Sequence, residues 1–437
     1  MLKGGEWVVQ DVHLREITPE WVAEATGGRL HPGGKPVFDL VWDSREATSG
    51  ALFVALPGRR THGREFAEEA LARGAHLVLS DRPGRATVEV GRPEEALVRL
   101  GSRLRALFPG KVVAVGGSSG KTTTKEAIAQ GLALPAPWGN QNTAPPLARF
   151  FLRLFASREE AKGAVVELGI DRIGEMAELM ELSRPDLSVL TALGEEHLEA
   201  FGDLKTVIRE EAGLLEAPLS LVHEEAARLL DSSKAFPTYG FQEATFLGKE
   251  LELLPEKSRF RYQSFQVEIP YPGLGPALAG LAALAVGELL GFDLEEVSAR
   301  LAGLRLPPGR MERKEFAGVV FLNDAYNANP LSVRAGLRWL SQQPGRKWAV
   351  LGEMRELGRE AERLHLEVAE EALRLGLSPL FLGPFARRMA ELGGAYAESL
   401  EEATLWLKAR VRPGDLVYLK ASRAVGLERI LELWDAS

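Results

Sequence analysis

The 437-residue sequence contains no cysteine. This absence excludes disulfide bonds, thiolate metal sites and cysteine nucleophiles. Basic residues are not in excess either: the formal net charge is −8, which argues against a general nucleic-acid or anionic-membrane binder. An anionic small-molecule substrate is compatible with this charge, because a local cluster of Arg and Lys is enough to bind it.

No apolar run is long and uninterrupted enough to cross a membrane. The least polar stretch, residues 274–292, contains Pro276 and Glu288 and is rich in Ala and Gly, which predicts a buried helix. The first seven residues, Met-Leu-Lys-Gly-Gly-Glu-Trp, carry charge and no apolar core, so they do not look like a signal peptide. We therefore expect a cytoplasmic protein without membrane insertion.

Asparagine is nearly absent. The five that occur are Asn140, Asn142, Asn323, Asn327 and Asn329. Scarce Cys and Asn together indicate selection against thermolabile side chains. Asparagine is common in turns, which is the alternative explanation for those that remain. Their confinement to two short clusters favours a functional role.

Apolar residues make up 45% of the chain and charged residues 26%, which is typical of a globular protein with two to four domains. Residues 1–108 show short strand patterns mixed with helical ones. Expected strands lie at 38–42, 52–56, 76–80 and 87–90, and a helical pattern covers 94–108. Pro109-Gly110 follows and predicts a domain boundary.

The remaining chain alternates strands and helices, which predicts α/β domains with mostly parallel sheets. In residues 109–308 the expected strands lie at 111–115, 164–168, 187–193 and 219–222. Period-two alternation within 245–269 predicts an antiparallel appendage before the buried helix. After Pro307-Pro308-Gly309, expected strands at 319–322, 348–351, 379–382 and 416–419 predict a second doubly wound domain over 309–437.

The strongest chemical signal is Gly117-Ser118-Ser119-Gly120-Lys121-Thr122, between an expected strand and an expected helix. Glycines let backbone N–H groups point at phosphate oxygens, and the helix adds its positive N-terminal end. Lys121 would reach the β- and γ-phosphates, and the Thr122 hydroxyl would bind Mg²⁺. The alternative is a Gly/Ser turn with a solvated lysine. The strand-before and helix-after context favours nucleotide binding.

This loop with its flanks, residues 115–126, looks like the signature of the Mur ligases, and further segments match that family in order. Residues 166–175 resemble the stretch whose glutamate holds Mg²⁺, which corresponds to Glu167. Residues 193–202 resemble the histidine motif, which makes His197 a ligand of a second metal. Residues 418–423 resemble the C-terminal motif near the reaction centre, and Asp43-Ser44-Arg45 with 52–58 resembles the UDP-binding domain. In isolation, Asp-Ser-Arg would be interpreted as a capped turn.

The block Asn-Asp-Ala-Tyr-Asn-Ala-Asn-Pro-Leu-Ser at 323–332 is similar to that of the members that add D-alanyl-D-alanine, and Gly-Glu-Met-Arg-Glu-Leu-Gly at 352–358 with His365 also fits them. The resemblance implies an ATP- and Mg²⁺-dependent ligase that joins D-alanyl-D-alanine to UDP-N-acetylmuramoyl-tripeptide through an acyl phosphate. The expected domains are a UDP-substrate domain at 1–108, a central ATP-binding P-loop domain at 109–308 and a Rossmann-like domain at 309–437, in a monomer.

Site residues follow from the phosphate loop and from this resemblance. The expected catalytic residues are Lys121, His197, Glu211, Arg310 and Lys420. The expected ATP contacts are Gly117, Ser118, Ser119, Gly120, Lys121, Thr122, Thr123, Asn140 and Asp324. The expected substrate contacts are Ser44, Arg45, Asn142, Thr143, Tyr326, Asn327, Asn329 and Ser422. The expected metal ligands are Thr122, Glu167, His197 and Glu211.

Three departures from the family pattern stand out. Residues 272–277 replace the His-Asn pair that contacts adenine, and the loop 140–143 is shorter than usual. The position of the family's carbamylated lysine is occupied by Glu211, whose permanent carboxylate would replace the modified lysine. A register slip would make Glu210 the equivalent residue, and a solvated helix face is the third explanation. The rival functions are another amide-forming relative, such as a folylpolyglutamate synthase or a different muramoyl ligase, and a non-enzymatic P-loop switch.

Overall fold

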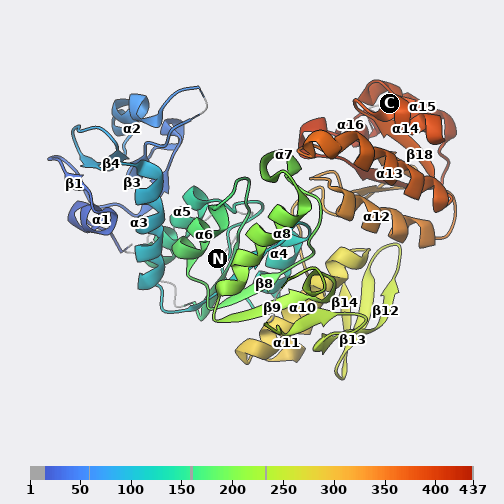
Figure 1. Cartoon of the computed structure of the whole chain (residues 1–437), viewed down its shortest axis with the longest axis horizontal. Coiled ribbons are helices and arrows are strands. Elements are labelled where there is room, and N and C mark those ends of the chain that lie inside the picture. Colours follow the sequence, from blue (N-terminus) through green and yellow to red (C-terminus); the bar gives the residue numbers. More distant parts are fainter. Residues whose placement is uncertain (1–14, 59, 158–160, 232–233, 436–437) are drawn as a thin grey trace.

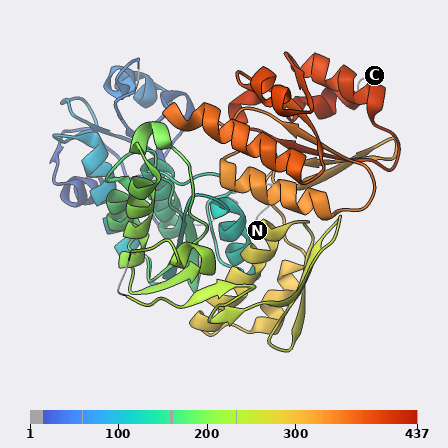
Figure 2. The ribbon, with the colours of Figure 1, turned by 45° about the vertical axis from the view of Figure 1, so that its right-hand side comes forward.

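The computed structural model describes residues 15–58, 60–157, 161–231 and 234–435. The prediction about the first seven residues lies outside this part of the chain. The described residues form three α/β regions, with the N-terminal region on the left of Figure 1, the central one below and the C-terminal one at the upper right. Figure 2 shows the same arrangement turned by 45° about the vertical axis. The expected three-domain α/β architecture is confirmed.

The N-terminal region is built on a five-stranded sheet of order β1-β5-β4-β3-β2, in which only the β1–β5 pair is antiparallel. The four expected strands all form, each shorter than its apolar pattern. Its elements are α1 (Pro19–Thr26), β1 (Arg29–Leu30), β2 (Asp39–Val41), η1 (Ser44–Glu46), β3 (Ala51–Val54), η2 (Gly63–Phe66), α2 (Ala67–Ala72), β4 (Leu77–Ser80), β5 (Thr87–Glu89) and α3 (Pro93–Leu107).

The central region is built on a six-stranded parallel sheet of order β11-β10-β9-β8-β6-β7. Parallel strands need crossover helices on both faces, so they are buried and read as unbroken apolar runs. Its elements are β6 (Lys111–Gly116), α4 (Lys121–Gly131), α5 (Ala144–Ala156), β7 (Gly163–Glu167), α6 (Glu175–Ser183), β8 (Leu187–Leu190), α7 (Leu198–Phe201), α8 (Leu204–Ala212), η3 (Gly213–Glu216), β9 (Leu219–His223), α9 (Glu224–Ala227), β10 (Thr238–Gly240) and β11 (Phe246–Leu247).

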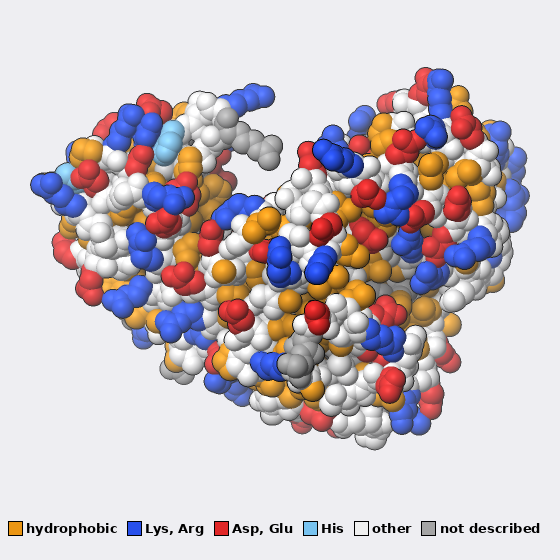
Figure 3. Space-filling model, viewed as in Figure 1, with side chains coloured by type: hydrophobic (Ala, Val, Ile, Leu, Met, Phe, Trp, Pro, Cys, Tyr) orange, Lys and Arg blue, Asp and Glu red, His pale blue; other side chains and the backbone are white. Residues whose placement is uncertain are grey.

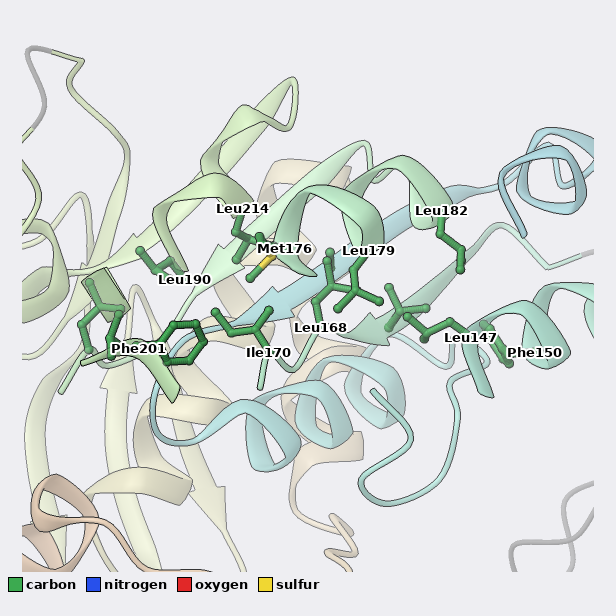
Figure 4. Close-up of a cluster of buried hydrophobic side chains, with 14 of the residues drawn as sticks. Leu147, Phe150, Leu168, Ile170, Met176, Leu179, Leu182, Leu190, Phe201 and Leu214 are labelled. Carbon is green, nitrogen blue, oxygen red and sulfur yellow. The ribbon is translucent and has the colours of Figure 1, made fainter. Parts of the chain in front are cut away.

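The core on one face of this sheet is a continuous set of buried side chains, part of which is drawn in Figure 4. Leu168 and Ile170, which follow β7, pack with Met176 and Leu179 of α6. The same cluster continues through α3 into the N-terminal region, so the two regions share one apolar core. Burial of this kind contributes roughly 1.5–3 kcal/mol per large side chain.

An antiparallel sheet of order β12-β13-β14 follows, as the period-two pattern predicts, although Phe246–Leu247 instead extends the parallel sheet as β11. The helix α10 then packs between α4 and this sheet, which explains why it is apolar on all sides. The elements are β12 (Lys249–Leu253), β13 (Ser258–Tyr262), β14 (Phe265–Ile269), α10 (Leu274–Leu290) and α11 (Leu294–Leu301). Among the described residues, no helix is both long and apolar enough to span a membrane.

The C-terminal region is a six-stranded sheet of order β15-β16-β20-β17-β18-β19, parallel except for the edge pair β15–β16. The four expected strands form its centre. Its elements are β15 (Glu312–Phe316), β16 (Val319–Asn323), α12 (Pro330–Gln342), β17 (Lys347–Leu351), η4 (Gly358–Glu360), α13 (Ala361–Arg374), β18 (Ser378–Leu382), α14 (Ala386–Leu392), β19 (Ala395–Ala397), α15 (Leu400–Arg410), β20 (Leu416–Lys420), η5 (Arg423–Val425) and α16 (Arg429–Asp435).

Candidate active site

A cavity of about 540 Å³ lies between the central and C-terminal regions. Figure 3 shows, on one face of the molecule, a notch between the N- and C-terminal regions. The cavity walls include the segments that follow β6, β7, β8, β16, β17 and β20, at the carboxyl ends of two parallel sheets, where α/β folds present ligand-binding groups. The sequence-predicted residues that line it are Ser118, Ser119, Gly120, Lys121, Thr122, Asn140, Asn142, Glu167, His197, Arg310, Asp324, Tyr326, Asn327, Asn329, Lys420 and Ser422.

The phosphate loop connects β6 to α4, as expected. Gly117 and Gly120 have φ of +118° and +88°, which favour glycine, and a Cβ on Gly117 would lie 2.3 Å from Thr191 Oγ1. The helix α4 begins at Lys121 with no side chain capping its first turn. Its N-terminal N–H groups and its dipole therefore face the cavity and favour an anion.

Lys121 lies among carboxylates on the floor of the cavity. Its Nζ is 3.3 Å from Glu196 Oε1 and 4.0 Å from Glu211 Oε1, and it donates to the Gly117 carbonyl. Burial opposes the ammonium charge, but Glu196, Glu211 and Glu167 outweigh that effect and raise the pKa of Lys121. The lysine is therefore a permanent cation beside the phosphate loop.

Glu211 is fully buried behind this loop and does not line the cavity. Its Oε2 accepts a hydrogen bond of 2.7 Å from Gly117 N–H, while Oε1 has no hydrogen-bond partner among the described residues. Burial raises its pKa to about 7, against the opposing effect of Lys121. Glu210, by contrast, accepts from Gly174 N–H at the surface. Glu211, and not Glu210, is thus the carboxylate at the phosphate loop.

Thr122 and Glu167 provide the hard oxygen ligands that Mg²⁺ prefers. Thr122 Oγ1 accepts from Arg310 Nη2 at 2.8 Å, and Glu167 Oε1 accepts from Asn142 Nδ2 at 3.0 Å. Glu167 Oε2 is buried and has no partner among the described residues. A buried carboxylate oxygen without a donor is costly, and a bound cation would remove that cost. These residues therefore fit a magnesium ion.

His197, the expected ligand of a second metal, lies among carboxylates. Its Nδ1 is 2.6 Å from Glu356 Oε2, and its Nε2 is 3.5 Å from Asp171 Oδ1. Burial would lower the pKa of His197, but the hydrogen bond with Glu356 and the charge of Glu196 raise it. No three His, Cys, Asp or Glu side chains in the described ranges form a metal-binding group.

From the C-terminal region, Asp324 and Lys420 reach the cavity as an ion pair of 2.6 Å. Tyr418 OH also donates to Asp324, at 2.9 Å, so Tyr418 and Lys420 together fix the position of the Asp324 carboxylate. Arg310 stacks on the Tyr326 ring, with 4.2 Å between its guanidinium carbon and the ring centroid. The cavity thus has cations from two regions, which suits a multiply charged anion.

The asparagine block 323–332 forms the turn between β16 and α12. Asn329 caps α12, because its Oδ1 accepts from Ser332 N–H at 2.9 Å. Its Nδ2 donates to the Ser118 carbonyl of the phosphate loop at 3.0 Å. Asn327 is exposed on the cavity wall. Ser422 Oγ accepts from Arg355 N–H at 2.9 Å.

A second cavity of about 120 Å³ adjoins the phosphate loop at Ser119, Gly120 and Thr123. It is lined by residues 273–276, the segment that departs from the family's His-Asn pair. Trp339 of α12 lines the same space, and its buried Nε1–H has no hydrogen-bond partner among the described residues.

Some predicted residues lie elsewhere. Ser44 is buried and Arg45 exposed in η1 of the N-terminal region, where Asp43 Oδ1 accepts from Arg45 N–H, so the local structure is the capped turn. Thr143 is the residue before α5, and neither it nor the serine–arginine pair lines either cavity. Gly117 shapes the phosphate loop from behind.

Sequence reasoning missed several charged residues of the cavity. Those that line it are Asp171, Glu196, Arg355, Glu356 and Arg423. Each lies within or beside a motif already singled out: two in residues 166–175 and 193–202, two in 352–358, and one at the end of 418–423. Adjacency to a motif was the available signal, but it could not distinguish these side chains from solvated charges.

Three family models match the chain in order. They are the Mur ligase family catalytic domain over residues 40–107, the Mur ligase middle domain over 115–287 and the Mur ligase glutamate ligase domain over 309–423. These matches extend over all three regions of the structure.

Individual proteins are similar along almost the whole chain. The UDP-N-acetylmuramoyl-tripeptide–D-alanyl-D-alanine ligase of Treponema pallidum (strain Nichols) is 30% identical over 94% of this chain and 95% of that protein. The crystal structure of MurF from Acinetobacter baumannii has a TM-score of 0.88 at 28% identity, covering 98% of this chain and 100% of that one. MurF ligase from Thermotoga maritima in complex with ADP has a TM-score of 0.81 at 28% identity, covering 91% and 97%.

Proposed function

The chain belongs to the Mur ligase family, and we propose that it joins D-alanyl-D-alanine to UDP-N-acetylmuramoyl-tripeptide in an ATP-dependent reaction of peptidoglycan synthesis. The observation that carries the proposal is the cavity between the central and C-terminal regions. There a phosphate loop, an unpartnered carboxylate oxygen of Glu167 and the asparagine block converge. The similar ligase and MurF structures favour this acceptor over those of other amide ligases.

The proposed nucleotide site combines the phosphate loop with the second cavity. Residues 117–123 would bind the phosphates of ATP, and Asn140 and Asp324 would contact the nucleotide. Trp339 Nε1–H would donate to a ring nitrogen of the base, in place of the family's His-Asn pair. Supporting this, residues 273–276 and Trp339 line a space that adjoins the loop.

Mg²⁺ would be held by Thr122 and Glu167. When bound, the ion neutralises phosphoryl charge and orients the phosphates. The proposal includes one ion only, because no three His, Cys, Asp or Glu side chains among the described residues form a metal-binding group and Glu211 does not line the cavity.

In the proposed reaction, an oxygen of the tripeptide's terminal carboxylate attacks the γ-phosphorus, and ADP leaves. The amine of D-alanyl-D-alanine then attacks the resulting acyl phosphate, so the C–N bond forms while the C–O bond to phosphate breaks, and the nitrogen loses a proton to solvent. Lys121, Arg310 and Lys420 would neutralise the developing charge. Catalysis here is mainly positioning and electrostatic stabilisation.

The remaining assignments complete the proposal. Residues 1–108 would bind the UDP end of the donor through Ser44 and Arg45, residues 109–308 would hold ATP, and residues 309–437 would supply the acceptor site. Asn142, Thr143, Tyr326, Asn327, Asn329 and Ser422 would contact the two peptide substrates. The enzyme would act as a monomer in the cytoplasm, where ATP is available.

Phosphate release tests the proposal directly. We expect release to require ATP, Mg²⁺, UDP-N-acetylmuramoyl-tripeptide and D-alanyl-D-alanine together, with one phosphate per amide bond formed. Release with a folate and glutamate would indicate a folylpolyglutamate synthase. Release with a shorter muramoyl donor and a single amino acid would indicate another muramoyl ligase. Release of phosphate that is indifferent to both peptide substrates would indicate a P-loop switch.

A further inference from the structure

The loop between β17 and η4 has no regular secondary structure, yet it presents two charged side chains to the cavity. Arg355 and Glu356 line the wall, and Glu356 also contacts His197 of the central region. Gly352 and Glu353 are anchored to the end of β20 and the residues after it, because Gly352 N–H donates to the Lys420 carbonyl and Ser422 N–H donates to the Glu353 carbonyl. On the other side of Met354, Arg355 N–H donates to Ser422 Oγ, and the Glu356 carbonyl accepts from Glu199 N–H. Met354 lies between these contacts, and its N–H needs an anchor of its own.

That anchor is His365 of α13. Met354 N–H donates to His365 Nε2 at 2.9 Å, and the other ring nitrogen, Nδ1, lies 2.6 Å from the Ala361 carbonyl. A carbonyl can only accept, so Nδ1 carries the hydrogen, and Nε2 must offer its lone pair to Met354. The network therefore assigns one neutral tautomer to this ring.

The surroundings hold the ring in that form. His365 is 1% exposed, and its ring centroid lies 4.8 Å from that of Phe385. Burial lowers the pKa of His365, against the smaller effects of Ala361 and Glu353, so the ring is neutral at pH 7. Met354 is also buried, so its N–H has no access to water as an alternative acceptor.

We propose that His365 is a positioning residue for the ligation reaction: by accepting from Met354 N–H it fixes the 353–356 loop and so places Arg355 and Glu356 at the cavity wall. The inference rests on the proposed function, because it takes this cavity as the place of reaction. The alternative is that the His365 ring only fills space in the core. In that case its substitution would lower folding stability without a specific effect on turnover.

Two substitutions separate these roles. His365→Phe keeps a ring of similar size against Phe385 but removes the acceptor, so Met354 N–H is left unpaired. His365→Gln loses the ring but carries an amide oxygen at about the reach of Nε2, which can accept from Met354 N–H. If the ring matters only for packing, His365→Gln should lose more stability than His365→Phe. If the acceptor matters for the reaction, His365→Phe should lose more activity than His365→Gln.

The kinetic experiment measures phosphate release at saturating ATP and UDP-N-acetylmuramoyl-tripeptide with D-alanyl-D-alanine varied. We expect His365→Phe to lower kcat/KM for the dipeptide about tenfold or more, His365→Gln to stay within about threefold of the unmodified enzyme, and the Kd for ATP to change less than about threefold in both. Equal losses in both variants that follow their melting temperatures, or unchanged kinetics of His365→Phe, would overturn the proposal.

A coupling measurement uses His365→Leu, a second variant without the acceptor, in case His365→Phe does not fold. If His365 acts through the loop, the effects of His365→Leu and of the exposed Arg355→Ala should not add, because both act on the same loop. Additive effects would contradict this mechanism. Amide hydrogen exchange of His365→Gln and His365→Leu, measured over residues 352–357, needs no turnover. Fast exchange of the Met354 amide in His365→Leu but not in His365→Gln supports the anchor even if the proposed substrates are wrong, whereas equal exchange in both variants refutes it.

Discussion

The side-chain amide of Asn329 donates to the carbonyl oxygen of Ser118 at 3.0 Å, across 211 positions of sequence and between two different sheets. The same side chain caps α12 through its oxygen. Aspartate could cap the helix but not donate to the carbonyl, and alanine could do neither. Asparagine is therefore required by two simultaneous contacts, which explains its retention in a chain with only five asparagines.

The first prediction follows from this pair of contacts. Asn329→Asp should keep the cap of α12 and change the melting temperature by less than about 3 °C, yet lower ligation on the order of tenfold to a hundredfold. Asn329→Ala should lose both properties. Asp293→Asn, which alters the cap of α11 away from the cavity, is the matched control and should change neither. Normal ligation by Asn329→Asp would reduce Asn329 to a helix cap.

The second prediction concerns Lys121→Ala. Loss of this cation should raise the barrier by about 3–5 kcal/mol, on the order of 10²–10⁴ in rate, measured as phosphate release under saturating substrates. Lys111→Ala, at the exposed start of the preceding strand, should leave turnover unchanged. Activity of Lys121→Ala within tenfold of the unmodified enzyme would exclude the lysine from the mechanism.

The third prediction concerns Glu211, whose carboxylate holds Gly117 N–H. Glu211→Gln retains an acceptor and should keep turnover within about fivefold, whereas Glu211→Ala leaves the N–H unpaired and should lose about tenfold or more. Glu210→Ala is the neighbouring control and should be active. Removing bicarbonate from the buffer should have no effect on the unmodified enzyme. A dependence on bicarbonate would show that a carbamylated lysine elsewhere is needed.

The fourth prediction concerns the second cavity. Trp339→Phe keeps the aromatic ring but removes the N–H, so the Kd for ATP should rise about 2- to 10-fold, the usual range for one hydrogen bond. Trp348→Phe removes a different indole N–H, which donates to Asp415, and should leave ATP binding intact while lowering stability. Isothermal calorimetry distinguishes the two. An unchanged Kd for Trp339→Phe would exclude this donor from base binding.

The fifth prediction concerns pH and the contact between the N-terminal and central regions. Asp39 of β2 accepts from both Arg149 and Arg153 of α5. Burial would raise the pKa of Asp39, but hydrogen bonds from Arg153 and Arg149 outweigh that effect and lower it. Because the pKa of Asp39 is lower in the folded state than in the unfolded state, its contacts with the two arginines stabilise the folded protein above about pH 4. This contribution disappears as the pH falls through the folded-state pKa of Asp39.

Melting temperatures against pH measure this contribution. Asp39→Asn should lose on the order of 2 kcal/mol of unfolding free energy between about pH 5 and 8, and its difference from the unmodified protein should shrink below about pH 4. Asp43→Asn removes a more exposed Asp–Arg pair of the same region and should have little effect. A difference for Asp39→Asn that stays constant down to pH 3 would contradict the assignment.

The sequence alone was sufficient for the architecture and for the phosphate loop. Parallel strands buried on both faces read as short apolar runs, and the glycines of residues 117–120 leave a local signature because their φ values are a local property. The all-apolar helix α10 and the antiparallel strands β12–β14 were also predictable, since periodicity reports burial within one element.

The pairing of residues that lie far apart in the sequence was decided only by the tertiary structure. Glu196 lies beside Lys121, Glu356 beside His197, and Asn329 beside Ser118 because sheet order and domain packing bring separate strand ends together. Sequence periodicity carries no information about such distant neighbours. The distinction between Glu210 and Glu211 therefore depended on which of them faces the phosphate loop.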